Sequence, residues 1–455
     1  MNRNDWLLSA ISVVVTLGVA LGLLRWLAPG LIGLPVDLQL VQISKEVPPF
    51  YDNVFRAEDI RSTSFLLQDP WLTRARPFYP DAGTTGPNDL LGFRNRAIPA
   101  AADIVTIGDS QTYGNNATLE SNWPSRLAAA VGNPPPVVYN AATGVWSALE
   151  YLYMSERAMA FRPRVVIIAF YSGNDPLGAF TQAYGNPRWA KYKVSPDLKS
   201  SDAPSVKFPA PREEQWTATL SDGTEMTFTP QLRHSNTTAH RAVDAGWAIM
   251  KRAATEIAVA YRGSGIRLII TLIPTKELVM ARRLEFDDVA APPQYRALVR
   301  DETARIRDFA THVVALPGVT YVDLLSPLAQ AGRIDAGIYP ADADGHPLAP
   351  GYDVIARTLA SVLAGAFPPP RPGLYRVVAA PDRIGQLRLV SPAGWWVFED
   401  LRMALNNGWG VKGTDDQWTI RSAPSDGRLF ATWPYLGRVD SVDPARFGPA
   451  SIATP

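Results

Sequence analysis

After residue 100, hydrophobic positions follow two patterns in turn, one typical of β-strands and one typical of α-helices. Short β-branched runs, typical of buried strands, are separated by longer segments whose apolar residues recur at helical spacing. This alternation predicts an α/β fold in which helices cover a parallel sheet. The expected strands are Asp103–Ile107, Val137–Asn140, Val165–Phe170, Arg267–Ile273 and Thr320–Leu324. The expected helices lie near 123–131, 148–160, 241–262, 294–311 and 351–365.

One long polar, proline-rich segment interrupts this rhythm between Asp175 and His240. Within it, Trp216–Leu220 and Met226–Thr229 flank a Ser-Asp-Gly turn, which predicts a β-hairpin. We therefore expect an insertion over residues 176–240 that leaves the sheet after a strand. Such an insertion would form a lid or a specificity wall.

The N-terminal region contains an apolar run without charge from Trp6 to Leu24. At about 1.5 Å per helical residue this run nearly crosses a hydrocarbon layer of ~30 Å. We expect a single-pass transmembrane anchor over residues 6–27, with the rest of the chain outside the cytoplasm, in the periplasm. A cleaved signal peptide and a buried soluble helix are the alternatives, and the basic residues flanking the run set its orientation only weakly.

Two further regions flank the α/β pattern. Residues 36–100 are rich in proline and aromatic residues, and we expect them to form a membrane-proximal arm packed on a main domain at 101–366. The run from Pro368 to Gly373 predicts an extended linker. Beyond it, residues 374–455 contain short strand-like segments and five tryptophans, which predict a small β domain with either a buried tryptophan core or a sugar-stacking face.

Composition narrows the possible chemistry. Lysine and arginine total 44 against 43 acidic residues, so the net charge is +1 and no basic tract favours nucleic acid as a partner. The chain has no cysteine, which excludes disulfides, a thiol nucleophile and cysteine-ligated metal. Only four histidines are present, so an imidazole-dependent mechanism has few candidates.

Polar residues follow the expected strands, at the edge where parallel sheets bind ligands. Four segments carry them: Gly108–Gly114 after the first strand, Asn140–Gly144 after the second, Tyr171–Asp175 after the third, and Asp342–Pro347 before the last helix. Lys276 also follows a strand, but a lone lysine there is interpreted as a solvated end or an ion-pair partner.

These residues supply the parts of acyl transfer through a serine ester. A serine hydroxyl becomes nucleophilic when an imidazole takes its proton, and a carboxylate holds that imidazole in one tautomer. Ser110, His346 and Asp344 fit these roles, with Asp342 as the alternative acid. His234, His240 and His312 lie in the insertion or within a helical segment and fit less well.

An oxyanion site would complete this set. The backbone amides of Ser110 and Gly144 and the side-chain amide of Asn174 are the expected donors. Two of these residues have an alternative structural role. Gly144 could be required because the backbone there adopts a positive φ angle, and Asn174 could cap a helix or close a turn.

Four sequence blocks carry a resemblance to a known superfamily. GDSQTYG at 108–114, the Gly144 segment, SGND at 172–175 and DGHP at 344–347 resemble, in this order, the blocks of the SGNH/GDSL hydrolases. The resemblance covers about residues 92–365, where GFRN at 92–95 and IPTK at 273–276 look like segments of extracytoplasmic bacterial members.

This resemblance implies a flavodoxin-like three-layer α/β/α fold, no metal or cofactor, and esterase or acyltransferase activity. It implies Ser110 as nucleophile, activated by His346 with Asp344, and Gly144 and Asn174 in the oxyanion site. Many members place the acid three residues before the histidine, where this chain has Ala343, and Pro347 and Leu348 replace residues that are often tryptophan and asparagine.

From these observations we expect a membrane-anchored serine esterase that removes O-acyl groups, such as acetate, from a glycan. An O-acetyltransferase using the same residues is one alternative. A non-catalytic glycan-binding or assembly protein is another.

Overall fold

The computed structural model describes residues 64–68, 72–99, 101–132, 135–238 and 240–367. It also describes the C-terminal segments 373–377, 386–391, 394–398, 401–409, 421–422, 435–439 and 441–447. The expected anchor at 6–27 and the prolines at 368–370 lie outside these residues. Among the described residues, no helix is both long enough and apolar enough to cross a membrane.

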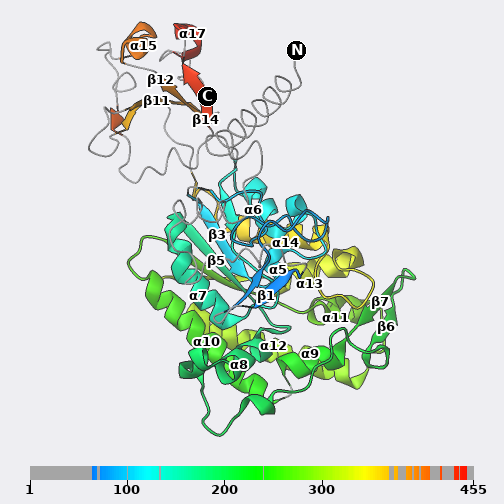
Figure 1. Cartoon of the computed structure of the whole chain (residues 1–455). Helices are drawn as coiled ribbons and strands as arrows, with labels where there is room; N and C mark the ends of the chain where they lie inside the picture. The colour runs from blue at the N-terminus through cyan, green and yellow to red at the C-terminus, as the bar shows by residue number, and fades with distance from the viewer. Residues whose placement is uncertain are drawn as a thin grey trace, which may run out of the picture. The chain divides into compact units, whose positions relative to one another are not determined.

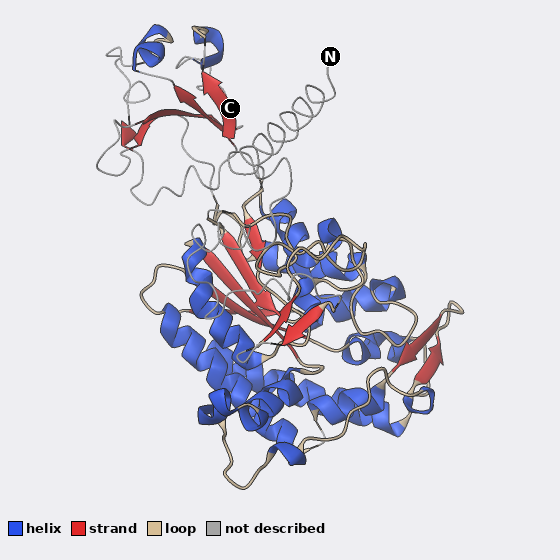
Figure 2. Cartoon of the chain, in the orientation of Figure 1, coloured by secondary structure: helices blue, strands red, loops and turns tan. Residues whose placement is uncertain are grey.

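A five-stranded parallel sheet forms the centre of the main domain (Figure 2). The strand order is β4-β3-β5-β8-β9. The strands are β3 (Ile104–Gly108), β4 (Val138–Asn140), β5 (Val165–Tyr171), β8 (Arg267–Ile273) and β9 (Val319–Asp323). By chain order this is 2-1-3-4-5, the doubly wound arrangement of flavodoxin-like sheets. The predicted parallel α/β fold and all five strands are confirmed, with bounds shifted by one residue or less.

Helices cover both faces of this sheet (Figure 1). One group packs together on one face: α7 (Ala148–Ala158), α8 (Asp175–Gly185), α10 (Arg241–Tyr261) and α12 (Pro293–Val314). The opposite face is covered by α6 (Trp123–Val131), α11 (Lys276–Phe286), α13 (Leu325–Ile334) and α14 (Ala349–Ser361). The five expected helices are all present.

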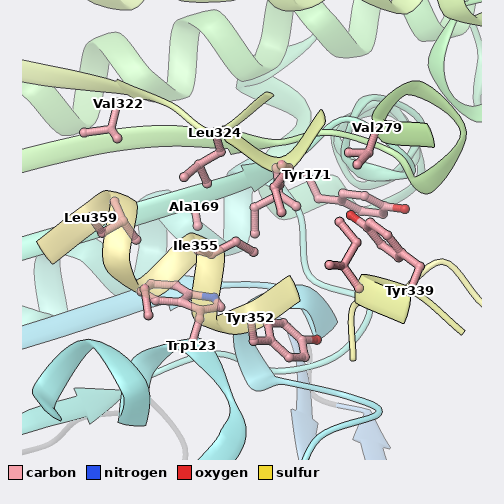
Figure 3. Close-up of a cluster of buried hydrophobic side chains, with 14 of the residues drawn as sticks. Trp123, Ala169, Tyr171, Val279, Val322, Leu324, Tyr339, Tyr352, Ile355 and Leu359 are labelled. Atoms are coloured by element: carbon pink, nitrogen blue, oxygen red, sulfur yellow. The ribbon is translucent and has the colours of Figure 1, made fainter. Parts of the chain in front are cut away.

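Alternation along β5 shows why both faces are apolar. Phe170 contacts the rings of Tyr151 on α7 and Phe309 on α12. Its neighbours Ala169 and Tyr171 point the other way, into the cluster drawn in Figure 3. Because successive strand residues face opposite sides, a strand covered on both faces reads as one continuous apolar run.

The insertion begins later along the chain than residue 176. Residues 175–185 form α8, which packs closely on α10: a Cβ at Gly246 would lie 1.7 Å from the carbonyl oxygen of Pro176. The predicted hairpin is confirmed as β6 (Trp216–Thr219) and β7 (Glu225–Phe228), and it is followed by α9 (Pro230–Thr237). Short 3-10 helices lie at Leu119–Ser121, Met159–Phe161, Pro187–Tyr192, Ser200–Asp202, Arg212–Glu214 and Ala336–Ile338.

Residues 72–99 of the expected arm belong to the main domain. The described part of the arm includes the short strands β1 (Leu66–Gln68) and β2 (Thr73–Ala75). Phe93 is fully buried and contacts the rings of Tyr139 and Trp146 edge-on. The Trp146 indole also donates a hydrogen bond to the carbonyl of Thr73. Residues 72–99 therefore help to form the core near β4.

The C-terminal segments form a second sheet with its own core. The strand order is β13-β10-β11-β12-β14. The elements are β10 (Gly373–Val377), β11 (Gln386–Ser391), β12 (Gly394–Phe398), α15 (Leu401–Asn406), β13 (Arg421–Ser422), β14 (Tyr435–Val439) and α17 (Pro444–Phe447). Trp409 is fully buried there, and its indole donates to the carbonyl of Phe447 at 2.6 Å. This tryptophan is a core residue, while Trp418 and Trp433 lie outside the described residues.

Candidate active site

Ser110 stands at the carboxyl end of β3, in a turn that its neighbours fix. It is the first residue of the one-turn helix α5 (Ser110–Tyr113), whose N-cap Asp109 accepts a hydrogen bond from the Gln111 amide at 2.9 Å. The helix ends at Gly114 with φ 91°, a left-handed conformation that favours glycine. At Gly108 a Cβ would lie 2.1 Å from Thr112 Oγ1, so the strand can enter this turn only with glycine there.

The structure brings Ser110, His346 and Asp344 together across 236 residues of sequence. Ser110 Oγ lies 2.8 Å from His346 Nε2. On the other side of the ring, His346 Nδ1 lies 2.6 Å from Asp344 Oδ1. Because the carboxylate can only accept, Nδ1 carries the proton and Nε2 accepts from the serine hydroxyl. This is the arrangement that general-base activation of a hydroxyl requires.

The loop geometry separates the two candidate acids. Asp342 Oδ1 accepts the backbone amide of Asp344 at 2.9 Å, so this carboxylate closes the turn. Asp344 Oδ1 accepts both the amide and the ring Nδ1 of His346. Burial opposes ionisation of Asp344, but the hydrogen bond and charge of His346 outweigh it and hold the pKa of Asp344 below its usual range. Asp344, rather than Asp342, orients the imidazole.

A second carboxylate, that of Asp109, lies beside the serine. Its Oδ2 is 3.4 Å from Ser110 Oγ, which is beyond the usual O–H···O range, whereas His346 Nε2 is at 2.8 Å. Burial raises the pKa of Asp109 to about 6, against the lowering effects of the Gln111 amide and His346. The shorter contact determines the donor direction, so the serine hydroxyl faces the imidazole.

Gly144 lies beside Ser110. A Cβ built on Gly144 would stand 4.0 Å from Ser110 Cβ. The alternative that Gly144 serves a positive φ angle is wrong, because the left-handed residue is its neighbour Val145, at φ 65°. A β-branched residue in this region is a genuine backbone outlier, and such strain gathers at functional sites. Val145 is also 57% exposed.

Asn174 follows β5, the strand next to β3 in the sheet. It occupies the N-cap position of α8, yet its side chain makes no capping hydrogen bond. Its Oδ1 is buried without a hydrogen-bond partner among the described residues. The turn is closed instead by Asp175, which accepts from the Tyr171 amide at 2.8 Å and the Tyr151 hydroxyl at 3.0 Å. The capping alternative for Asn174 therefore has no contact to support it.

If Asn174 donates to an oxyanion, as the sequence predicts, its replacement by alanine should lower kcat by about 100-fold to 1000-fold, the cost of losing one such donor. The thermal midpoint should change little, because no cap is lost. Asn186→Ala is the matched control: its side chain caps the helix at 187–192 through the Arg188 amide at 3.0 Å. That variant should lose stability and keep its kcat. A destabilised Asn174→Ala protein with unchanged kcat would assign Asn174 a structural role only.

Sequence patterns did not reveal the buried side chains that hold the turn at Ser110. Arg94 is fully buried and donates to the carbonyls of Gly86, Gly114 and Ala117 at 2.7, 2.5 and 2.8 Å. Asn95 donates to the Asn140 carbonyl and accepts from its amide. The only signal for both residues was the GFRN segment of the resemblance.

Comparisons with known proteins give similarity in structure only. No family model matches the chain, and no curated protein matches it. A catalytic mutant of Axe2, an acetylxylan esterase from Geobacillus stearothermophilus, is 11% identical, with a TM-score of 0.32, covering 58% of this chain and 95% of that one. An extracellular lipase from Streptomyces rimosus is 14% identical, with a TM-score of 0.29, covering 57% and 99%.

A protein of Parabacteroides merdae described as a GDSL-like lipase is 13% identical, with a TM-score of 0.32, covering 58% of this chain and 99% of that one. Likeness at these TM-scores carries no conclusion about function.

Proposed function

We propose that the protein is a serine esterase that removes O-acyl groups, such as acetate, from a glycan outside the cytoplasm. The observation that carries the reaction is the continuous hydrogen-bonded chain Ser110–His346–Asp344, with contacts of 2.8 and 2.6 Å. The location rests on the apolar run from Trp6 to Leu24. The acyl group and the glycan rest on that apolar run, on the resemblance of the four sequence blocks and on the tryptophan-rich C-terminal region.

The proposed reaction has two halves. Ser110 Oγ attacks the ester carbonyl carbon while His346 Nε2 takes the hydroxyl proton. The tetrahedral intermediate collapses, the bond to the alcohol oxygen breaks, and His346 returns the proton to the leaving alcohol. Water then attacks the acyl-serine with His346 as base again, which releases the carboxylic acid and restores Ser110.

The negative charge of the intermediate needs donors at the switch point of the sheet, between β3 and β5. The amide of Ser110, at the first position of α5, has no carbonyl partner within its own helix. The amide of Gly144 and the side-chain amide of Asn174 complete the proposed oxyanion site. Asp344 stabilises the imidazolium that forms during each transfer.

Acetate release from acetylated xylan tests this proposal with the full-length chain. We expect free acetate from the wild type and none above background from Ser110→Ala, and a fluorophosphonate should modify Ser110 in peptide maps. Equal release by both proteins would refute the assignment. If a glycan and an activated acetyl donor give acetylated glycan in place of free acetate, the protein is a transferase and the hydrolytic proposal is wrong.

A further inference from the structure

Lys276, set aside on sequence grounds as a solvated or paired lysine, is one of the most buried charged residues among those described. It is the first residue of α11, directly after β8, and it is 1% exposed. Among the described residues no carboxylate forms an ion pair with its ammonium, which instead donates hydrogen bonds to backbone carbonyls. The acceptors are Pro340 and Asp342, each at 2.6 Å, and Thr227 at 3.0 Å.

These contacts join two segments that are far apart in the sequence. Pro340 and Asp342 lie in the loop that leads into Asp344 and His346, whereas Thr227 lies on β7 of the insertion hairpin. The Thr227 amide also donates to the Ala341 carbonyl at 2.7 Å. Three donors of one ammonium thus meet three carbonyls, which satisfies it completely. A fourth carbonyl, that of Asp344, lies at 3.5 Å, beyond an ordinary hydrogen bond.

A second buried cation, Arg233 on α9, lies next to Gly345 in the same loop. A Cβ at Gly345 would lie 2.4 Å from Arg233 Nη2 and 3.5 Å from Tyr171 Oη, so the turn approaches this guanidinium closely. Figure 3 shows Tyr171 beside Tyr339 in the buried cluster. The loop from Pro340 to His346 is therefore contacted by groups of α9, α11 and β7.

We propose that Lys276 is a positioning residue that holds the Asp344–His346 turn at the place where the imidazole meets Ser110. This role rests on the proposed function. The insertion hairpin then acts as a support of the proposed catalytic loop, because it contributes one of the three carbonyls and the Thr227–Ala341 hydrogen bond.

The protonation of Lys276 gives this role a pH dependence. Burial lowers the pKa of Lys276 to about 8, although Glu277, Asp342 and Asp344 raise it; Arg233 lowers it further. The ring of Phe228 is the apolar neighbour, 5.4 Å from Nζ. Above that pH the neutral amine has two N–H donors for three carbonyls, so one contact is lost.

The sign of the stability effect separates this event from alkaline unfolding. Because the unfolded lysine keeps its proton to a higher pH than the folded one, stability contributed by this group rises, not falls, above pH 8. The wild type should therefore lose part of its kcat above about pH 8 while its thermal midpoint does not fall with it.

Lys276→Met tests the proposal in the full-length protein, with three readouts. The first is the rate at which a fluorophosphonate modifies Ser110, which needs no knowledge of the substrate. The second is the proton NMR signal of the His346 Nδ1–H held by Asp344, which should be strongly deshielded. The third is the thermal midpoint. Lys251→Met is the matched control, since Lys251 pairs with Asp308 on the surface at 2.9 Å.

We expect Lys276→Met to slow labelling by about 100-fold, the typical cost of an ångström-scale misplacement of a catalytic group. The deshielded proton signal should be lost, and Lys251→Met should leave both readouts unchanged. In a His346→Ala background, Lys276→Met should slow labelling almost no further, because both substitutions act through the imidazole of His346. Wild-type labelling rates with the signal retained, or an equal cost in the His346→Ala background, would overturn the positioning role.

This design distinguishes failure of the proposed function from failure of the positioning role. If the wild type is never labelled, the proposed function fails, while the proton signal still tests whether Lys276 holds the turn. If Lys276→Met does not fold, Lys276→Gln, which keeps a shorter donor group, is measured by the same three readouts and judged by the same criteria.

Discussion

Replacing Ser110 or His346 by alanine will lower kcat for ester hydrolysis by on the order of 10⁶-fold, and the double variant will cost no more than either single one. The reason is the 2.8 Å contact between Ser110 Oγ and His346 Nε2. Without the imidazole the hydroxyl keeps its proton, and without the hydroxyl the imidazole has nothing to activate. Initial rates on p-nitrophenyl acetate measure the effect, and calorimetry verifies that each variant folds.

His312→Ala is the control for this pair. Its imidazole is also partly buried, on α12, where Nε2 contacts Thr255 Oγ1 at 2.9 Å and the Lys251 carbonyl at 3.0 Å. It should keep kcat within about a factor of two, as is usual for a change away from the reacting groups. Effects of the two single variants that multiply in the double variant would show that Ser110 and His346 do not act as one unit.

The sheet was predictable because its strands are covered on both faces. Val165–Tyr171 and Arg267–Ile273 are nearly uninterrupted apolar runs, and their ends deliver the polar segments to one edge. The polar segments that follow the first three predicted strands could therefore be placed together from the sequence. The carboxyl edge of a parallel sheet is where such residues converge.

Helices whose backbones pack closely together were harder to predict from the sequence. The sequence of α8 begins Asp-Pro-Leu-Gly, which is typical of a loop, and it became part of the expected insertion. What makes it a helix in the core is its crossing with α10 at Gly246, where no side chain separates the two backbones. A glycine within a helical pattern does not reveal its partner.

The supports of the site were hidden for a different reason. Arg94 and Lys276 are satisfied mainly by carbonyl oxygens, and every residue has one. No sequence motif marks which carbonyls will converge on a buried cation. The lone-lysine interpretation of Lys276 was wrong because the insertion hairpin, distant in sequence, closes over it.

Asp344→Asn should lower kcat by about 10⁴-fold, while Asp342→Asn should leave it nearly unchanged. Asparagine at 344 can donate to Nδ1, which favours the tautomer whose proton sits on Nε2 and blocks acceptance from Ser110. Asparagine at 342 keeps an oxygen for the Asp344 amide, now 2.9 Å from Asp342 Oδ1, so the turn survives. Side-by-side steady-state rates on p-nitrophenyl acetate test the difference between the two substitutions.

Spacing alone could not choose between these two carboxylates, since both precede His346 within one loop. The structure distinguishes them by what each oxygen accepts: the Asp344 carboxylate contacts the imidazole at 2.6 Å, and the Asp342 carboxylate accepts the backbone amide of Asp344. If Asp342→Asn gives the larger loss, the loop rearranges during the reaction and Asp342 becomes the orienting acid. If neither variant loses activity, His346 works without a carboxylate partner, and the proposed role of Asp344 is wrong.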